Sequence, residues 1–424
     1  MPPMAGEVGS NRTLSLDIGG TTAKICFIED GIPQTTRKFE VARAWRDVKG
    51  SGLPVRVPTV ELVEIGAGGG SIASVDMLRR LKIGPESAGS EPGPAACGRG
   101  GAQATVTDAH LIVGNIAADG FADGMITLVP KNAPQAIAQH VMAAMGLDCV
   151  SMAAAGIIEL ADETMANAAR VHGIELGHDI AGFDLLVTGG GGALHAARIA
   201  EKLGIRRIIV PQNAGVGSAV GFLRSPVAFE SAVSVMAVLD EIDGQELSDR
   251  IRRQLSDVRA IVGQVVAPER ISTAIKIDLR YKGQGLELCL DVEDADQLIS
   301  GLPALAEAFV TRYTRSVGFA LHDIPVEVVC VSVTAREQRQ IGQSAAKAPR
   351  VSLPDTAQQG TRGVFDLAAG CRIPYAVLER AQLTRAPRAG PAVIREAQTT
   401  TLVRPNWSVR STDLGHLVLE RDAP

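Results

Sequence analysis

The chain has 424 residues, of which 46% are hydrophobic and 21% are charged, and its formal net charge of −5 contains no long run of one sign. This length predicts roughly two or three packed domains, and the charge pattern excludes the basic surface that binds nucleic acid or anionic lipid. Because the first residues combine no basic and apolar stretch, and no apolar run of about 18 residues occurs, we expect a cytoplasmic protein without a membrane segment.

The residue types favour an α/β ligand-binding protein. Aromatic residues make up only 3% of the chain and there are 45 glycines, so the core must consist of Val, Ile, Leu and Ala between many tight turns. The six cysteines form no C-x-x-C pair, which argues against a disulfide framework and a zinc knuckle. We expect reduced thiols, most of them buried.

The first predicted elements are two strands joined by a tight turn. Thr13 to Asp17 and Ala23 to Ile28 are short apolar runs, and Gly19-Gly20-Thr21-Thr22 lies between them. Glycine permits close backbone approach, so successive N–H groups of this turn can face a phosphate while the two threonine hydroxyls add hydrogen bonds. Asp17, at the end of the first strand, would supply the hard oxygen ligand that a phosphate-bound Mg²⁺ needs.

Two alternatives to this phosphate site were weighed. A P-loop is excluded because no G-K-[ST] follows and the next segment has the pattern of a strand rather than a helix. An ordinary β-hairpin turn is the structural alternative, although such a turn needs neither the Asp nor the double Thr.

A second glycine loop follows a predicted strand from Thr59 to Ile65. This loop, Gly66 to Ser71, contains Gly68, Gly69, Gly70 and Ser71, which we predict to shape a substrate pocket or to contact phosphate. A purely structural turn explains it equally well.

Asp108 and His110 follow a loop-rich stretch from Gly84 to Gly101. The pair could bind a metal or act in acid–base catalysis, and we take Asp108 as a candidate catalytic residue. With one residue between them, a local turn or helix cap is the competing interpretation.

The third glycine loop lies between a strand and a helix. Helical spacing from Pro134 to Met145 and from Met152 to Leu176 predicts two helices. Phe183 to Thr188 is then a buried strand, Ala193 to Leu203 is a helix ending at Gly204, and Ile208 to Pro211 is a further strand.

Gly189, Gly190, Gly191 and Gly192 form the turn before that helix, where free N–H groups and the helix dipole attract an anion or a nucleotide. Leu194 and His195 occupy the positions of the third fingerprint glycine, which disfavours a dinucleotide site. Close packing of strand and helix is the structural alternative, and we expect His195 to be a core histidine.

The pattern changes after about residue 230. A charged amphipathic segment from Leu239 to Val262 precedes predicted strands at Ala274 to Tyr281, Glu287 to Val292 and Val326 to Thr334. Ser344 to Pro354 is polar and contains proline, as in a linker, and short strands with turns follow it.

Several long stretches resemble the hydantoinase A/5-oxoprolinase family, which includes the related acetone carboxylase subunit. They are DIGGTTAKICFIEDG, EIGAGGGSIASVD, GPESAGSEPGPAACGRGGAQATVTDAHLIVG, VTGGGGALHAARIAEKLGI, VPQNAGVGSAVGFL, the segment RYKGQGLE from Arg280 and the segment GPAVI from Gly390. Together they extend over nearly the whole chain.

The resemblance implies an α/β fold with an actin/hexokinase-like (ribonuclease H-like) ATPase lobe and a C-terminal, strand-rich α+β extension. On this basis residues 1–12 are a tail, 13–230 the ATPase lobe, 231–343 a C-terminal α+β region and 344–424 a strand-rich region. Complete family members begin with a further phosphate loop and domain, which we expect to be a separate or missing N-terminal lobe here.

The implied activity is ATP-dependent hydrolysis of a cyclic amide, a hydantoin or 5-oxoproline, with ATP and Mg²⁺ activating the amide oxygen by phosphorylation. Asp17, Gly19, Gly20, Thr21 and Thr22 would then contact phosphate and Mg²⁺, and the turn at 189–192 would lie near the adenosine. The implied partner is a hydantoinase B-type subunit. The alternatives are an acetone-carboxylase-like ligase subunit and a catalytically incomplete assembly subunit.

Overall fold

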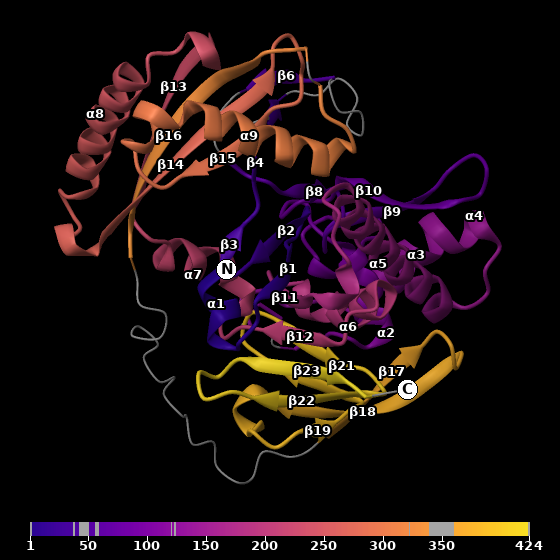
Figure 1. Cartoon of the computed structure of the whole chain (residues 1–424). Helices are drawn as coiled ribbons and strands as arrows, with labels where there is room; N and C mark the ends of the chain where they lie inside the picture. Colours follow the sequence, from indigo (N-terminus) through magenta and orange to yellow (C-terminus); the bar gives the residue numbers. More distant parts are fainter. Residues whose placement is uncertain are drawn as a thin grey trace. The chain divides into compact units, whose positions relative to one another are not determined.

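The computed structural model describes residues 2–36, 39–41, 51–55, 59–119, 121–122, 124–321, 323–338 and 360–422. It divides into two compact units, one made of Met1–Arg224 with Ile341–Pro424 and the other of Ser225–Gln340 (Figure 1). The predicted domain ranges stay predictions, and the predicted linker at 344–354 lies outside the described residues. Within the described ranges no single helix is long and apolar enough to span a membrane; only α3 to α5, Asn132–Met145 with Val150–Glu175, bent by 84°, pass that test as a pair.

The first unit is built on a nine-stranded sheet in the order β19-β22-β23-β12-β11-β1-β2-β3, with β8 also paired to β2. β1 and β2 form an antiparallel hairpin, while β11 runs parallel to both β1 and β12. The predicted strand, turn and strand at the N-terminal end are therefore confirmed. The strands of this sheet are β1 Arg12–Ile18, β2 Ala23–Glu29, β3 Ile32–Pro33, β8 Val63–Ile65, β11 Asp184–Thr188, β12 Arg207–Val210, β19 Arg388–Ala389, β22 Trp407–Ser411 and β23 Leu417–Arg421.

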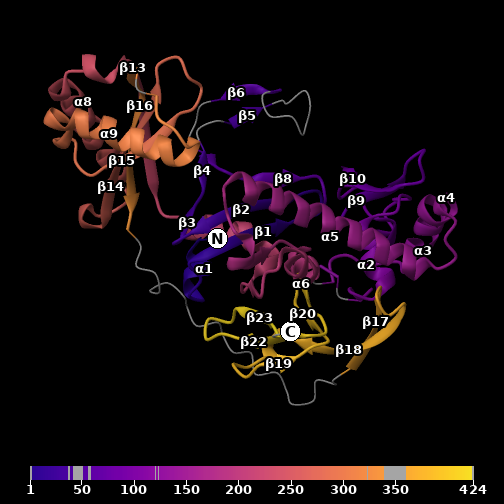
Figure 2. The ribbon, with the colours of Figure 1, turned by 45° about the vertical axis from the view of Figure 1, so that its right-hand side comes forward.

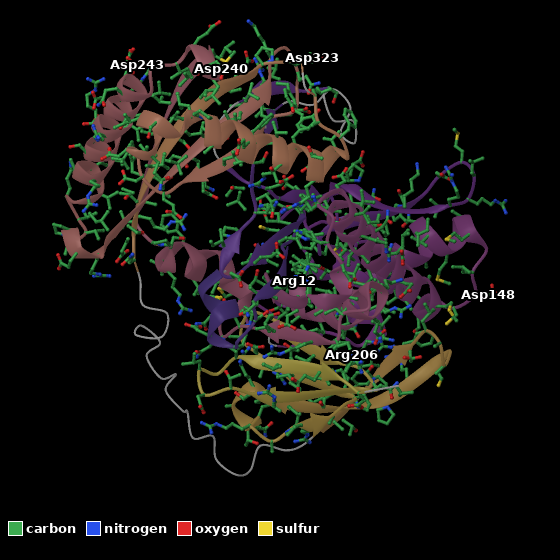
Figure 3. All side chains as sticks on the ribbon, in the orientation of Figure 1. Arg12, Asp148, Arg206, Asp240, Asp243 and Asp323 are labelled. Atoms are coloured by element: carbon green, nitrogen blue, oxygen red, sulfur yellow. The ribbon has the colours of Figure 1, made fainter. Side chains whose placement is uncertain are left out.

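Apolar residues on β1, β2 and β11 are almost completely buried, because this part of the sheet lies inside the unit. Leu14, Phe27 and Val187 are exposed by 1% or less. Arg12, labelled in Figure 3, stands at the start of β1. Its guanidinium lies 4.3 Å from the centre of the Phe183 ring in a cation–π contact.

The helices of the first unit are α1 Pro2–Glu7, α2 Val106–Val113, α3 Asn132–Ile137, α4 Ala143–Met145, α5 Val150–Glu175, α6 Gly192–Leu203 and α7 Gly217–Arg224. α6 packs against β11 and β12, and the long helix α5 packs against α6 and α2 (Figure 2). The three helices predicted from apolar spacing are confirmed, and Gly204 ends α6 in the left-handed conformation at φ 75°. α2 and α7 were not predicted.

The C-terminal strands join the first unit. β23 pairs antiparallel with β12, so it extends the central sheet from a distant part of the sequence. A four-stranded sheet lies beside it (Figure 2) and consists of β17 Gly360–Asp366, β18 Cys371–Glu379, β20 Ala392–Arg395 and β21 Thr400–Val403.

The predicted strand from Thr59 to Ile65 is wrong as a single element. The structure divides it into β7 Thr59–Val60, which pairs with β4 Thr35–Thr36, and β8, which pairs with β2. Glu61 and Leu62 lie between β7 and β8. The run is not one strand because β7 and β8 pair with different neighbours. The other two-stranded sheets are β5 Phe39–Val41 with β6 Leu53–Val55 and β9 Ser71–Val75 with β10 Leu81–Ser87.

The second unit is a four-stranded antiparallel sheet with two helices and its own core. Its elements are β13 Ala228–Val238, β14 Ile271–Tyr281, β15 Leu288–Val292, β16 Val326–Glu337, α8 Gly244–Val262 and α9 Gln297–Val317. The buried cluster between sheet and helices includes Ile251 of α8, Phe309 of α9 and Val333 of β16. β14, β15 and β16 confirm the three predicted strands, and α8 lies in the predicted amphipathic segment, whereas β13 and α9 were not predicted.

No two of the six cysteines, all of which lie in the described ranges, are joined in a disulfide, and the prediction that most are buried is wrong. Cys149 and Cys371 are exposed, and the other four are half-buried.

Candidate functional site

The turn after Asp17 and the four-glycine turn lie side by side. β1 and β11 are parallel neighbours, and Asp17 is paired in register with Thr188. Both strands therefore end at the same edge of the sheet, where ligands of open α/β sheets bind. The turn 19–22, called the phosphate turn after the predicted role that stays a prediction, leaves β1 there, and Gly189 to Gly192 leave β11.

Gly189 fits this edge only because it has no side chain. Its φ is +82°, and a Cβ atom would lie 2.2 Å from the Ile18 carbonyl oxygen and 2.6 Å from Asp17 Oδ1. The N–H of Gly191 donates to the same Ile18 oxygen at 3.1 Å. The glycines therefore do allow close packing, as the structural alternative for this turn predicted. This close packing lets the two turns lie next to each other.

The phosphate turn offers three successive N–H donors. The Gly19 N–H donates to the Thr22 carbonyl at 3.0 Å, whereas the N–H groups of Gly20, Thr21 and Thr22 have no acceptor among the described residues. Gly20 and Thr21 are exposed and Thr22 is half-exposed. Successive free N–H groups in a turn form a concave site for an anion.

The four-glycine turn adds one donor to this site. Gly189 donates to the Ala214 carbonyl at 2.8 Å and Gly192 to the Gly189 carbonyl at 3.2 Å, so these groups are occupied. Gly190 is exposed, and its N–H has no acceptor in the described part of the chain.

The loop Gly66 to Ser71 braces the phosphate turn. Gly69 and Gly70 donate to the carbonyl oxygens of Gly19 and Gly20 at 3.1 and 2.6 Å. The Gly68 N–H donates to Ser71 Oγ at 2.8 Å, and the Ser71 N–H to the Gly68 carbonyl at 3.1 Å. All four N–H groups of Gly68 to Ser71 are therefore used inside the protein, and their role in a substrate pocket stays a prediction.

Asp108 caps α2 and anchors a loop. Its carboxylate accepts hydrogen bonds from Thr105 N–H and Oγ1 at 3.0 and 2.7 Å, and from the N–H groups of Ala95 and Ala96 at 3.3 and 2.7 Å. Asp108 is fully buried, and burial raises the pKa of its carboxyl although the hydrogen bonds from Thr105 and Ala96 oppose the rise. These contacts are those of the capping alternative; a catalytic role for Asp108 stays a prediction.

His110 pairs with His195 rather than with Asp108. His110 Nε2 lies 3.1 Å from His195 Nε2, and Asn115 Nδ2 lies 2.8 Å from His110 Nδ1. His195 Nδ1 lies 2.6 Å from Asp162 Oδ1, so four buried side chains form one chain across α2, α6 and α5. Burial and the neighbouring His195 lower the pKa of His110 well below its ordinary value, whereas burial raises the pKa of Asp162 against the opposing effect of His195.

One assignment of protons satisfies every bond of this chain: Asn115 donates to a neutral His110, His110 Nε2–H donates to His195, and His195 Nδ1–H donates to Asp162. His195 is a satisfied core histidine, as the sequence predicted.

Two contributions to the site were missed by the sequence. Ser218, in α7, donates its hydroxyl hydrogen to Asp17 Oδ2 at 2.7 Å. Thr399 donates its hydroxyl hydrogen to the Gly190 carbonyl at 3.1 Å. The preceding residue, Gln398, packs closely against Gly215, where a Cβ would lie 2.6 Å from Gln398 Cβ. A signal for Ser218 was available, because the glycine-rich turn after β12 repeats the strand, turn and helix pattern of 184–203.

Asp17 has the chemistry expected of a Mg²⁺ ligand on a nucleotide. Mg²⁺ is commonly held by one or two carboxylates together with phosphate oxygens and water, so a single carboxylate beside an anion site fits it. Among the described residues no three His, Cys, Asp or Glu side chains are grouped to hold a metal ion. The phosphates would therefore have to supply ligands to the metal.

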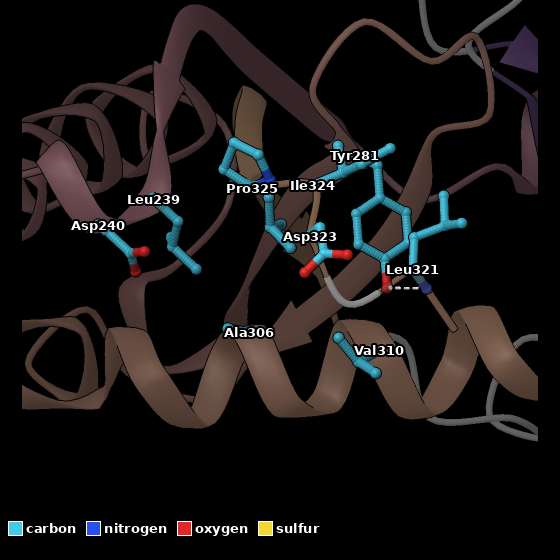
Figure 4. Close-up of a pocket in the computed structure, with 10 residues that line it drawn as sticks. Leu239, Asp240, Tyr281, Ala306, Val310, Leu321, Asp323, Ile324 and Pro325 are labelled. Atoms are coloured by element: carbon cyan, nitrogen blue, oxygen red, sulfur yellow. Dashed lines mark hydrogen bonds between the residues drawn. The ribbon is translucent and has the colours of Figure 1, made fainter. Parts of the chain in front are cut away.

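Two hollows among the described residues are lined by other parts of the chain. One of about 440 Å³ belongs to the second unit, where Asp240 and Asp323 stand beside apolar residues and the Leu321 N–H donates to Tyr281 Oη (Figure 4). The other, of about 280 Å³, is in the first unit and is lined in part by Asn213 and Ala397. The next residues in sequence, Ala214 and Gln398, lie beside Gly189 and Gly190. None of the predicted site residues lines either hollow.

Comparison with known proteins decides the family. The model of the hydantoinase/oxoprolinase family matches residues 3–231, a range that contains the phosphate turn, both other glycine loops and Ser218. The chain belongs to the hydantoinase/oxoprolinase family.

Relatives in this family include the caprolactamase subunit alpha of Pseudomonas jessenii, which is 30% identical over 96% of this chain and 58% of its own length. The 5-oxoprolinase 1 of Arabidopsis thaliana is 25% identical over 99% of this chain and 34% of its own length. The chain thus spans well under two thirds of the length of these hydantoinase/oxoprolinase relatives.

Solved structures have the same fold. The ATP-dependent caprolactamase from Pseudomonas jessenii superposes with a TM-score of 0.79 at 27% identity, over 99% of this chain and 60% of that one. Nucleotide-free acetone carboxylase superposes with a TM-score of 0.76 at 22% identity and the same coverage, which shows the mixed α/β fold alone. The predicted membership of the hydantoinase A/5-oxoprolinase family is confirmed.

Proposed function

We propose that this chain binds the phosphates of ATP at the turn 19–22, with Asp17 as a ligand of Mg²⁺, and serves an enzyme that opens a cyclic amide at the expense of ATP. One observation carries the proposal: the free N–H groups of Gly20, Thr21 and Thr22 belong to the turn that follows Asp17 at the carboxyl end of parallel strands. The exposed N–H of Gly190 adds a donor from the neighbouring turn.

The chemistry needs these groups because an unstrained amide resists water. Transfer of the terminal phosphoryl group to the amide oxygen yields ADP and a phosphorylated intermediate, whose carbon water then attacks. The C–N bond breaks and the nitrogen takes a proton, which leaves an acyl phosphate. A second water hydrolyses the acyl phosphate to the carboxylate and inorganic phosphate. N–H donors and Mg²⁺ stabilise the negative charge that moves during phosphoryl transfer. Asp108 receives no chemical step, since its carboxylate is occupied by four donors.

The proposal includes the actin/hexokinase-like ATPase lobe. It is supported by the antiparallel hairpin β1–β2 beside the parallel strand β11, followed by a glycine turn and α6. A partner subunit of the hydantoinase B type belongs to the proposal too, and the description of the caprolactamase relative as a subunit alpha supports it.

Titration of the chain with ATP by calorimetry, with and without Mg²⁺, tests the phosphate site. We expect binding at millimolar concentration or below, and we expect Asp17→Asn to weaken Mg-ATP binding by at least about tenfold, because it removes the charge at constant shape. Asp30→Asn is the matched control, since Asp30 is an exposed residue at the other end of β2. No binding by the wild-type chain, or equal affinities for all three proteins, would contradict the proposal.

The acetone-carboxylase-like alternative is compatible with the comparisons but is not favoured by them, because the likeness to the acetone carboxylase structure is one of fold. Phosphate release by the chain with its partner subunit separates the two activities. We expect stimulation by 5-oxoproline, a hydantoin or caprolactam, and none by acetone with bicarbonate. The reverse pattern would establish the ligase.

A further inference from the structure

The Asp17 carboxylate is held by a residue 201 positions away in the sequence. Ser218 lies in the first turn of α7, and its Oγ donates to Asp17 Oδ2 at 2.7 Å. The other carboxylate oxygen, Oδ1, faces Gly189, where a Cβ would approach it to 2.6 Å. One carboxylate oxygen therefore accepts a hydrogen bond from Ser218, and the other lies against the backbone of Gly189.

α7 is fixed at its other end as well. The guanidinium of Arg224, its last residue, is hydrogen-bonded to both carboxylate oxygens of Glu7 in α1. Glu7 Oε2 also lies 2.9 Å from His416 Nε2, and His416 Nδ1 accepts the Gln212 N–H at 3.1 Å. The helix that carries Ser218 is therefore tied to α1, to the segment before β23 and to the turn after β12.

The local surroundings suit a site that a ligand can reach. Ser218 is exposed and Asp17 is half-exposed, and the free N–H groups of Gly20 and Thr21 belong to the same turn region. An unrestrained aspartate side chain at a strand end can populate several χ1 rotamers, and only some would direct an oxygen toward a metal on the phosphates. Fixing the rotamer before binding removes that entropic cost from the affinity.

We propose that Ser218 is a positioning residue: its hydroxyl, fixed by α7, holds the Asp17 carboxylate in the orientation that accepts Mg²⁺ on the bound nucleotide. This inference rests on the proposed role of Asp17. We therefore expect Ser218 to affect the gain in nucleotide affinity that Mg²⁺ causes. We expect no effect on the affinity for metal-free nucleotide, which the backbone N–H donors bind.

The test measures the affinity for ATP with and without Mg²⁺ in five variants by calorimetry: wild type, Ser218→Ala, Ser218→Thr, Asp17→Asn and the double variant Asp17→Asn/Ser218→Ala. We expect Ser218→Ala to lower the gain in affinity from Mg²⁺ about fivefold to tenfold, the loss of one hydrogen bond to a charged group, and to leave metal-free binding unchanged. Ser218→Thr keeps the hydroxyl and should restore most of the gain. In the Asp17→Asn background, removal of the Ser218 hydroxyl should not lower the gain in ATP affinity from Mg²⁺ any further.

Ser74→Ala is the matched control, because Ser74 is an exposed residue of β9 and should bind like wild type. Equal loss of metal-free and metal-dependent binding in Ser218→Ala would overturn the inference, because the hydroxyl would then contact phosphate or support the fold. Additive effects of the two substitutions would also overturn it. If Asp17→Asn keeps the full Mg²⁺ gain, the proposed role of Asp17 fails, whereas loss of that gain in Asp17→Asn but not in Ser218→Ala defeats only the inference about Ser218.

Discussion

Gly189 combines a positive φ of 82° with contact distances that no side chain tolerates, 2.2 Å to the Ile18 oxygen and 2.6 Å to Asp17 Oδ1. Alanine at this position must strain the backbone or push β1 away from β11. We expect Gly189→Ala to lower the free energy of unfolding by about 2 to 4 kcal/mol, as measured by urea denaturation.

Gly190→Ala is the matched control for this prediction. A Cβ at Gly190 would make only an ordinary contact, 3.6 Å to the Gln398 oxygen, and the residue has no positive φ. Its free energy of unfolding should stay within about 1 kcal/mol of wild type. Equal stability of the two variants would contradict the account of how the turns are held together.

Among single residues, the sequence predicted those candidate site residues that are neighbours along the chain. Asp17 and the turn 19–22 carry their signal within a few positions, as do the four glycines. Ser218 and Thr399 were missed because each reaches the site from a distant segment. The glycine-rich turn before Ser218 is a local signal for it, whereas the isolated hydroxyl of Thr399 gives no pattern. Local sequence could not separate the two interpretations of Asp108, because a buried Asp that caps a helix and anchors a loop has the same local sequence as an acid–base residue; its catalytic role stays a prediction.

Helices α2, α5 and α6 are joined by the chain from Asn115 through His110 and His195 to Asp162. Burial and His195 lower the pKa of His110, so the folded protein binds fewer protons than the unfolded chain below about pH 6.5. Stability from the neutral His110 is thus fully present above that pH and is lost as the pH falls.

This gives a prediction for the pH dependence of stability. Between pH 6.5 and 5.5 the wild type should lose about 1 kcal/mol more free energy of unfolding than His110→Gln, which cannot take up the proton in the unfolded state. Urea denaturation at pH 7.5, 6.5 and 5.5 measures the two curves. Curves that stay parallel over this range would show that His110 is not held neutral.

Elements were predictable where apolar spacing is regular over a long range, as in α5 and in strands β14 and β16. α9 was missed although it covers Gln297–Val317, because Pro303 lies inside it and the sequence signal of an internal proline is a helix end. The run from Thr59 to Ile65 looked like one strand because periodicity does not reveal that its halves pair with different neighbours, β4 and β2.

The assembly of the first unit depends on residues at both ends of the chain. β23 lies against β12, and Leu419 of β23 pairs with Ile208 at full burial. Trp407 of β22 is exposed by only 1% and donates its indole N–H to Glu201 of α6 at 3.0 Å. No periodicity in the sequence predicts that strands after residue 400 extend a sheet formed by residues 12–210, because strand pairing over such a distance depends on tertiary packing.

Removal of the C-terminal strands should therefore unfold or aggregate the first unit. A chain that ends at residue 338 leaves β12 as an unprotected edge next to the apolar surface that Trp407 and Leu419 cover. We expect this chain to elute as aggregates from a size-exclusion column and to lack a cooperative thermal transition. The fragment 225–338 should instead unfold cooperatively, because its buried cluster, from Leu239 to Ala335, is formed by its own residues. A monomeric truncated chain with the melting behaviour of the full chain would show that β23 is dispensable for the central sheet.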